Sequence, residues 1–93
     1  MDLAIKNENL LVDVSKVKTG KTNYDNRNKI FANWCKKNNL SQDLDSLKKY
    51  LAREDIGVST KNNTKIAVKS ALKKIHKNNP ERLRELEDNF KEL

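Results

Sequence analysis

The chain has 93 residues, of which 35% are hydrophobic and 35% are charged, and its formal net charge is +7. This length allows one small, marginally stable domain with tails. Two Gly and one Pro in the whole chain argue against a turn-rich β fold, and the frequent Lys, Asn, Leu, Glu and Ala favour helices. We find no apolar run long enough to cross a membrane and no apolar segment typical of a signal peptide.

The positive charge is concentrated in the middle of the chain. Residues 19–79 hold fourteen Lys and Arg against five Asp and Glu, which gives +9. Residues 1–18 are neutral, and residues 80–93 carry −2. A basic segment of this kind favours nucleic acid over a membrane as the partner. An AT-rich genome, which enriches Lys and Asn whatever the function, is the alternative explanation.

Residues 1–18 are predicted to form a partly ordered N-terminal arm. Their apolar side chains fit a short strand, a helical turn or a docking strip, but a lone strand has nothing to pair with. The following KTGKT is predicted to be a linker centred on Gly20. It does not match a phosphate-binding loop, because the position five residues before Gly20 is Ser15 rather than Gly.

The first helix is predicted over residues 22–38. Thr22 is expected to cap it, with Asp25 in its first turn, and Asn38-Asn39 are expected to end it. Helical spacing places the large side chains on one face, which we expect to be buried: Tyr24, Phe31, Trp34 and Cys35, with Ile30 at the border. The opposite face is polar and holds Asn26, Lys29, Asn33, Lys36 and Lys37.

The second helix is predicted over residues 44–53, with Ser41, Asp43 and Asp45 as alternative caps. Its apolar stripe is expected to be buried and consists of Leu40, Leu44, Leu47 and Leu51. Residues 54–58 then read as a turn in which Gly57 is available for a positive φ.

The third helix is predicted over residues 59–77, with Ser59 as its cap. One side is apolar: Thr64, Ala67, Val68, Ala71, Leu72 and Ile75. Because Ala67 and Ala71 are small, another helix can approach closely there. The other side is polar, contains no carboxylate, and holds Asn62, Lys65, Lys69, Lys73 and His76, with Ile66 among them. A helix without acidic partners for its lysines favours a polyanion as the partner.

The fourth helix is predicted to begin at Asn79-Pro80, where Asn79 serves as N-cap and Pro80 as the first helical residue. Its narrow apolar stripe comprises Leu83, Leu86, Phe90 and Leu93. Two alternatives are open for this stripe. It either folds back on the core, or it docks on a neighbouring protomer or leads into a further domain.

Nothing in the sequence indicates catalysis. Cys35 is the only Cys, which favours a reducing, cytoplasmic location, and the only His, His76, lies on a different helix. We find no metal cluster, catalytic triad or phosphate loop. We therefore expect no enzymatic activity, no metal, no cofactor and no small-molecule substrate.

The order of these motifs resembles a known family, the core-binding (SAM-like) N-terminal domain of tyrosine recombinases and phage integrases. The resemblance covers residues 19–80. It rests on Thr22, Tyr24, Phe31, Trp34 and Cys35 followed by KKNNL, on Leu44, Leu47, Tyr50 and Leu51, on Ser59, Thr64, Ala71, Leu72 and His76, and on Asn79-Pro80.

The resemblance implies an all-α, small four-helix orthogonal bundle that clamps one side of double-stranded DNA with its first and third helices. The DNA-facing residues that it implies are Asn26, Lys29, Asn33, Lys36, Lys61, Asn62, Lys65, Lys69 and Lys73. The family's catalytic domain lies C-terminal to this one, and neither Tyr24 nor Tyr50 has the surroundings of a nucleophile. The chain is then either an excised domain or a small stand-alone protein.

Two functions remain open from the sequence. The first is a DNA-binding domain that contributes to site-specific recombination or DNA integration without catalytic residues. The second is a protein–protein interaction module that docks through Leu83, Leu86, Phe90 and Leu93, with the basic face incidental.

Overall fold

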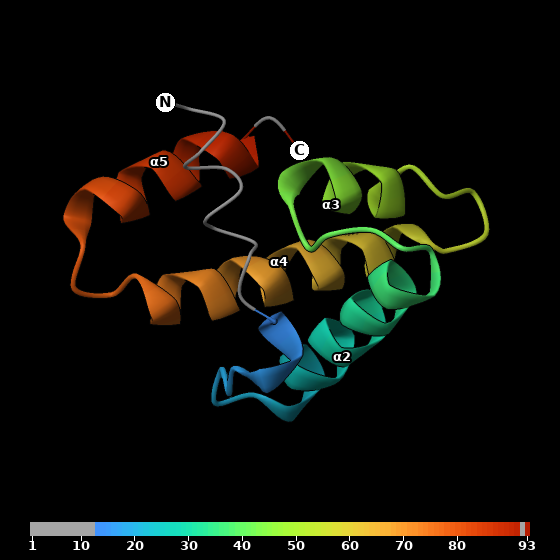
Figure 1. The fold of residues 1–93 in the computed structure, drawn as a ribbon, viewed down its shortest axis with the longest axis horizontal. Coiled ribbons are helices and arrows are strands. Elements are labelled where there is room, and N and C mark those ends of the chain that lie inside the picture. The colour runs from blue at the N-terminus through green and yellow to red at the C-terminus, as the bar shows by residue number, and fades with distance from the viewer. Residues whose placement is uncertain (1–12, 92) are drawn as a thin grey trace.

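A computed structural model describes residues 13–91 and residue 93. These residues form a short 3-10 helix, η1 (Val14–Lys16), and four α-helices: α2 (Thr22–Lys37), α3 (Leu44–Leu51), α4 (Val58–Ile75) and α5 (Pro80–Lys91). No strand occurs in the part of the chain that the structure describes, which confirms the prediction of an all-α fold with four helices. Figure 1 shows α4 running through the middle of the molecule, with α2 crossing it on one side.

The longest helix, α4, is the centre of the packing. It contacts η1, α2, α3 and α5. The apolar side predicted for it is buried, with no exposed surface on Thr64, Ala67, Val68, Ala71 or Leu72. The side chains that surround it come from the other elements and include Val14, Phe31, Leu47, Tyr50, Leu86 and Phe90.

The close approach predicted at Ala67 is made by α2. The amide nitrogen Nδ2 of Asn28 donates a hydrogen bond of 3.1 Å to the Ala67 carbonyl, and the Asn28 side chain is completely buried. A longer side chain than Ala at position 67 would hold the two helices further apart. Asn28 therefore fixes where α2 crosses α4.

The aromatic face of α2 is only partly inside the core. Phe31 is fully buried and meets the Tyr50 ring edge-to-face, with 5.6 Å between ring centroids. Trp34 and Tyr24, which were predicted to be core residues, are half-buried. Ile30, predicted at the border of the core, is 45% exposed. The core face of α2 is rotated toward Asn28, Ala32 and Cys35, which leaves Ile30 on the outside.

Several helix ends match the expected signals. Asn39 has a φ of 55°, and the Leu40 amide donates to the Cys35 carbonyl at 2.8 Å, so α2 ends in the left-handed cap predicted for Asn38-Asn39. Asp43, one of the three alternatives, caps α3 by accepting a bond from the Ser46 amide. Asn79 accepts a bond of 3.2 Å from the Arg82 amide and so caps α5 as predicted.

Three predictions about helix starts are wrong. Thr22 is the first residue inside α2 rather than its cap, and the carboxylate of Asp25 is held by Thr19, whose amide and hydroxyl both donate to it at 2.9 Å. The helix α4 begins at Val58, one residue before Ser59, with Gly57 as the capping residue. Gly57 has a φ of −77°, so it does not use a positive φ, because it serves as an extended N-cap rather than as a turn residue.

The end of the N-terminal arm belongs to the core. Val14 in η1 is completely buried, and its amide donates to the side-chain oxygen of Gln42 at 3.0 Å. Val17 packs against the same core. Leu10, Leu11 and Val12 of the predicted arm lie outside the described residues.

The last helix, α5, folds back on the core. Leu86 is fully buried and Phe90 is 2% exposed, and both belong to the core cluster. Leu83 and Leu93 are half-buried. Of the two alternatives for this stripe, the structure shows the first, and it leaves Leu86 and Phe90 covered by the chain's own core rather than open to a neighbouring protomer.

Candidate nucleic-acid interface

The outer face of α2 carries four of the sequence-predicted site residues. Asn26, Lys29, Asn33 and Lys36 are all exposed. Their spacing of three and four residues puts them on the side of the helix away from Phe31. The polar and apolar residues of α2 lie on opposite faces of the helix. Packing of the apolar face against the core therefore leaves the polar face exposed to solvent.

The cations of this face have no acidic partner among the described residues. Neither Lys29 nor Lys36 lies within ion-pair distance of a described carboxylate. Asp25 is the nearest acidic residue along the helix, and its pKa is lowered mainly by the Thr19 hydrogen bonds, with Lys29 contributing less. The positive charge of α2 is therefore left largely uncompensated.

The first half of α4 adds a second group of predicted site residues. Asn62 is exposed, and Lys61 and Lys65 are half-buried. Within the described ranges, these two lysines also form no ion pair. The pKa of the Asp55 carboxyl is lowered chiefly by its hydrogen bond from Arg53. The positive charge of Lys61 makes only a minor contribution to this shift.

A shallow hollow joins the two helices. It has a volume of about 380 Å³ and is lined by Asn23, Asn26, Arg27 and Ile30 of α2 and by Asn63 of α4. The structure therefore brings Asn26 beside the first half of α4. Arg27, Ile30 and Asn63 were not among the predicted site residues, and the residue that lines the hollow is Asn63 rather than its predicted neighbour Asn62.

The second half of α4 is different, because α5 supplies its missing acid. One carboxylate oxygen of Glu87 lies 2.8 Å from Nζ of Lys69, and the other lies 2.8 Å from Nζ of Lys73. Both lysines were predicted to face DNA. Glu87 offsets one of their two positive charges, and hydrogen bonds from Lys69 and then Lys73 lower the pKa of Glu87 to about 2. Helical periodicity could not reveal this pairing, because Glu87 is eighteen residues from Lys69 and lies on another helix.

A second hollow, of about 820 Å³, lies beside the outer face of α2 toward α3. It is lined by Ile30, Asn33, Trp34, Lys36 and Lys37 of α2 and by Arg53. The Arg53 guanidinium lies 5.2 Å from the centroid of the Tyr50 ring and is also hydrogen-bonded to Asp55 at 2.9 Å. Arg53 is thus a partly compensated cation, whereas no carboxylate in the described part of the chain pairs with Lys36 or Lys37 of the same hollow.

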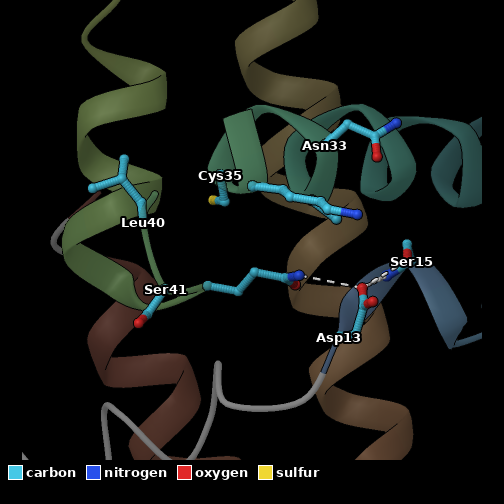
Figure 2. A pocket seen from close by; sticks show the side chains of 9 residues that line it. Asp13, Ser15, Asn33, Cys35, Leu40 and Ser41 are labelled. Carbon is cyan, nitrogen blue, oxygen red and sulfur yellow. Dashed lines mark hydrogen bonds between the residues drawn. The ribbon is translucent and has the colours of Figure 1, made fainter. Parts of the chain in front are cut away.

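A third hollow, of about 460 Å³, lies between η1 and the end of α2 (Figure 2). Asp13 and Ser15 face it from η1, and Leu40 and Ser41 face it from the other side. The Asp13 carboxylate accepts hydrogen bonds from the Ser15 hydroxyl at 2.6 Å and from Nε2 of Gln42 at 3.2 Å. A carboxylate in this position disfavours an anion, so we place the candidate interface on the opposite flank of Asn33.

Cys35 and Tyr50, two side chains of nucleophilic type, are both buried. Burial, and to a lesser degree Asp43, raises the pKa of the Cys35 thiol to about 11, which keeps it protonated. Tyr50 is 2% exposed and packed among aromatic rings. Within residues 13–91 and 93, no three His, Cys, Asp or Glu gather closely enough to hold a metal ion. None of the described helices has the length and apolar character to span a bilayer.

Comparison of the chain with protein-family models, with curated proteins and with solved structures gave no match.

Proposed function

We propose that the chain binds double-stranded DNA through the α2–α4 face, defined as the exposed outer side of α2 and the first half of α4. This face comprises Asn26, Lys29, Asn33, Lys36, Lys61, Asn62 and Lys65. One observation carries the proposal. The lysines of this face have no acidic partner among the described residues, whereas Lys69 and Lys73 are both paired with Glu87. Lys69 and Lys73 are therefore left out of the interface.

The chemistry of the face fits the DNA backbone. Each lysine that meets a phosphate releases a condensed counterion, and this release drives binding and makes it depend on salt. A helix of sixteen residues such as α2 is of a size that enters the major groove. Asn side chains between the cations are then within reach of base edges, and Asn pairs most favourably with adenine.

The family resemblance of residues 19–80 makes this proposal more specific. We infer a core-binding domain of the tyrosine recombinase type, with the SAM-like orthogonal arrangement of its helices. Such a domain holds DNA in the cytoplasm during recombination or integration, while the catalytic Arg, His and Tyr residues belong to another domain. It needs no cofactor, metal or small-molecule substrate.

The experiment is a fluorescence anisotropy titration of labelled duplex DNA with the purified chain at several salt concentrations. Four phosphate contacts, from Lys29, Lys36, Lys61 and Lys65, predict a slope of about −4 in a plot of log binding constant against log salt. Lys29→Ala and Lys36→Ala should each reduce the magnitude of the salt slope by about one and weaken binding to all DNA sequences alike.

Lys48→Ala is the matched control, because Lys48 is an exposed lysine on α3, outside the α2–α4 face. It should leave the slope almost unchanged. An equal reduction from Lys48→Ala and Lys36→Ala would mean that net charge alone attracts DNA, and the proposed face would be wrong.

A further inference from the structure

An apolar side chain stands at the centre of the proposed DNA-binding face. Ile30 is 45% exposed and is one of three large hydrophobic residues exposed in the described part of the chain, with Val58 and Ile66. It lies between Asn26 and Asn33, four residues after the first and three before the second, so the three share one ridge of α2. We call Asn26, Ile30 and Asn33 the α2 ridge.

The two hollows on the outer side of α2 meet at Ile30. The hollow toward α4 is lined by Asn26, Arg27 and Ile30, and the hollow toward α3 by Ile30, Asn33 and Lys36. An isolated exposed Ile needs no explanation on a protein surface. Ile30, however, has an Asn amide on each side along the helix, and the two hollows beside it contain the cations Arg27 and Lys36. It is therefore an apolar side chain surrounded by polar and positively charged groups.

This order of groups is complementary to A·T base pairs in the major groove. There adenine presents an acceptor and a donor that an Asn amide can satisfy together, and thymine presents its C5-methyl group to an apolar side chain. At 1.5 Å per residue, Asn26 and Asn33 are about 10 Å apart along the helix. With about 3.4 Å between successive base pairs, the α2 ridge covers about three of them.

We propose that the α2 ridge gives the chain a preference for A·T base pairs, with Asn26 and Asn33 on adenine edges and Ile30 on a thymine methyl group. The inference rests on the proposed DNA binding and adds its specificity. It applies to DNA rather than RNA, because the RNA major groove is too deep and narrow for side chains to read.

The test uses three labelled duplexes of equal length in fluorescence anisotropy at one salt concentration. The first has a central run of A·T pairs, the second has the same run with deoxyuridine in place of thymidine, and the third has a G·C centre. Deoxyuridine removes only the C5-methyl group. The wild-type chain should bind the thymidine duplex about fourfold more tightly than the deoxyuridine duplex, as the burial of one methyl group predicts. It should bind the G·C duplex more weakly again, by at least about fivefold relative to the first.

Ile30→Ala shows whether the difference between the thymidine and deoxyuridine duplexes depends on the Ile30 side chain or on a property of the duplexes alone. The variant should bind the thymidine and deoxyuridine duplexes equally, while its helical circular dichroism and melting stay unchanged because Ile30 lies outside the core. Asn33→Ala should reduce the preference for A·T over G·C and leave the effect of the methyl group in place. Lys48→Ala should keep all three affinities in the wild-type order.

The outcomes distinguish this inference from the proposal on which it rests. Salt-dependent binding that is equal for all three duplexes would overturn the A·T preference and leave DNA binding intact. Discrimination between thymidine and deoxyuridine that persists in Ile30→Ala would overturn the role of Ile30. Absence of salt-dependent binding to any duplex would overturn both, and would favour a protein partner for the α2 ridge.

Discussion

Nζ of Lys69 on α4 lies 2.8 Å from a carboxylate oxygen of Glu87 on α5. The second oxygen of the same carboxylate is equally close to Lys73, one turn further along α4. A single acidic residue thus pairs with two cations of a helix that has no carboxylate of its own, and it offsets one of their two charges. This contact divides α4 into a partly compensated second half and a first half whose lysines form no ion pair with the described residues, and it sets the edge of the proposed interface.

Removing the Glu87 charge should extend the basic surface along α4. Glu87→Gln frees Lys69 and Lys73, which lie four and eight residues after Lys65 and therefore on the same side of the helix. We expect DNA binding at low salt to become about twofold to fivefold tighter, the effect of a modest change in surface electrostatics. The measurement is the anisotropy titration used for the wild-type chain.

Asp88→Asn is the control for this prediction. It removes the same charge from the same helix, but Asp88 is exposed, and its ion-pair partner among the described residues is Lys91, at 4.0 Å. Its effect on DNA binding should be smaller than that of Glu87→Gln. Equal effects would show that overall net charge, rather than the release of Lys69 and Lys73, controls affinity.

The same carboxylate predicts a pH dependence of folding stability. The pKa of Glu87 falls from 4.5 to about 2 in the folded chain, chiefly through the hydrogen bond from Lys69. A lowered pKa stabilises the folded state above pH 4.5, and that stabilisation is lost as the pH falls from 4.5 toward about 2. Because the Glu87 side chain is 39% exposed, solvent screening should keep the contribution below about 1 kcal/mol.

Urea unfolding of the wild-type chain and of Glu87→Gln over this pH range checks the prediction. The wild-type chain should be the more stable at neutral pH, and the two should converge near the low end of the range. Other acidic residues titrate in both proteins, so the difference between the two curves reports on Glu87. A difference that stays constant with pH would contradict the ion pairs.

The burial of Leu86 predicts that α5 contributes to the stability of the whole domain. Leu86→Ala should lower the free energy of unfolding by about 2–5 kcal/mol, as do other large-to-small changes in protein cores. Leu83→Ala, at a half-buried position of the same helix, should cost less. Chemical denaturation followed by circular dichroism measures both. A loss from Leu86→Ala as small as that from Leu83→Ala would mean that α5 is only loosely attached.

Much of this fold could be predicted from the sequence, because the helices have clear apolar periods and strong end signals. The buried side of α4 and the caps at Asn39 and Asn79 follow directly from residue type and spacing. The capping residues of α2 and α4 could not be placed so well. Both helices are preceded by several residues able to cap, and contacts such as that of Thr19 with Asp25 decide among them.

The candidate site was harder to predict, since its limits depend on contacts between distant segments. Periodicity identified the exposed side of α2, but it could not show that Ile30 points outward, because that depends on how Asn28 seats α2 on Ala67. The pairing of Lys69 with Glu87 likewise requires α5 to fold back over α4. Helical spacing predicts which side of a helix is polar. Only the packing of the helices shows which residues on that side remain exposed and without an ion pair.

The most direct test of the α2–α4 face is nuclear magnetic resonance of the ¹⁵N-labelled chain titrated with duplex DNA. We expect backbone amide signals to shift around Asn26, Ile30 and Asn33 of α2 and around Asn62 of α4. Signals of α3 around Lys48 and of α5 around Asp88 should hardly move. Shifts centred on α5, or spread evenly over all four helices, would contradict the proposed interface.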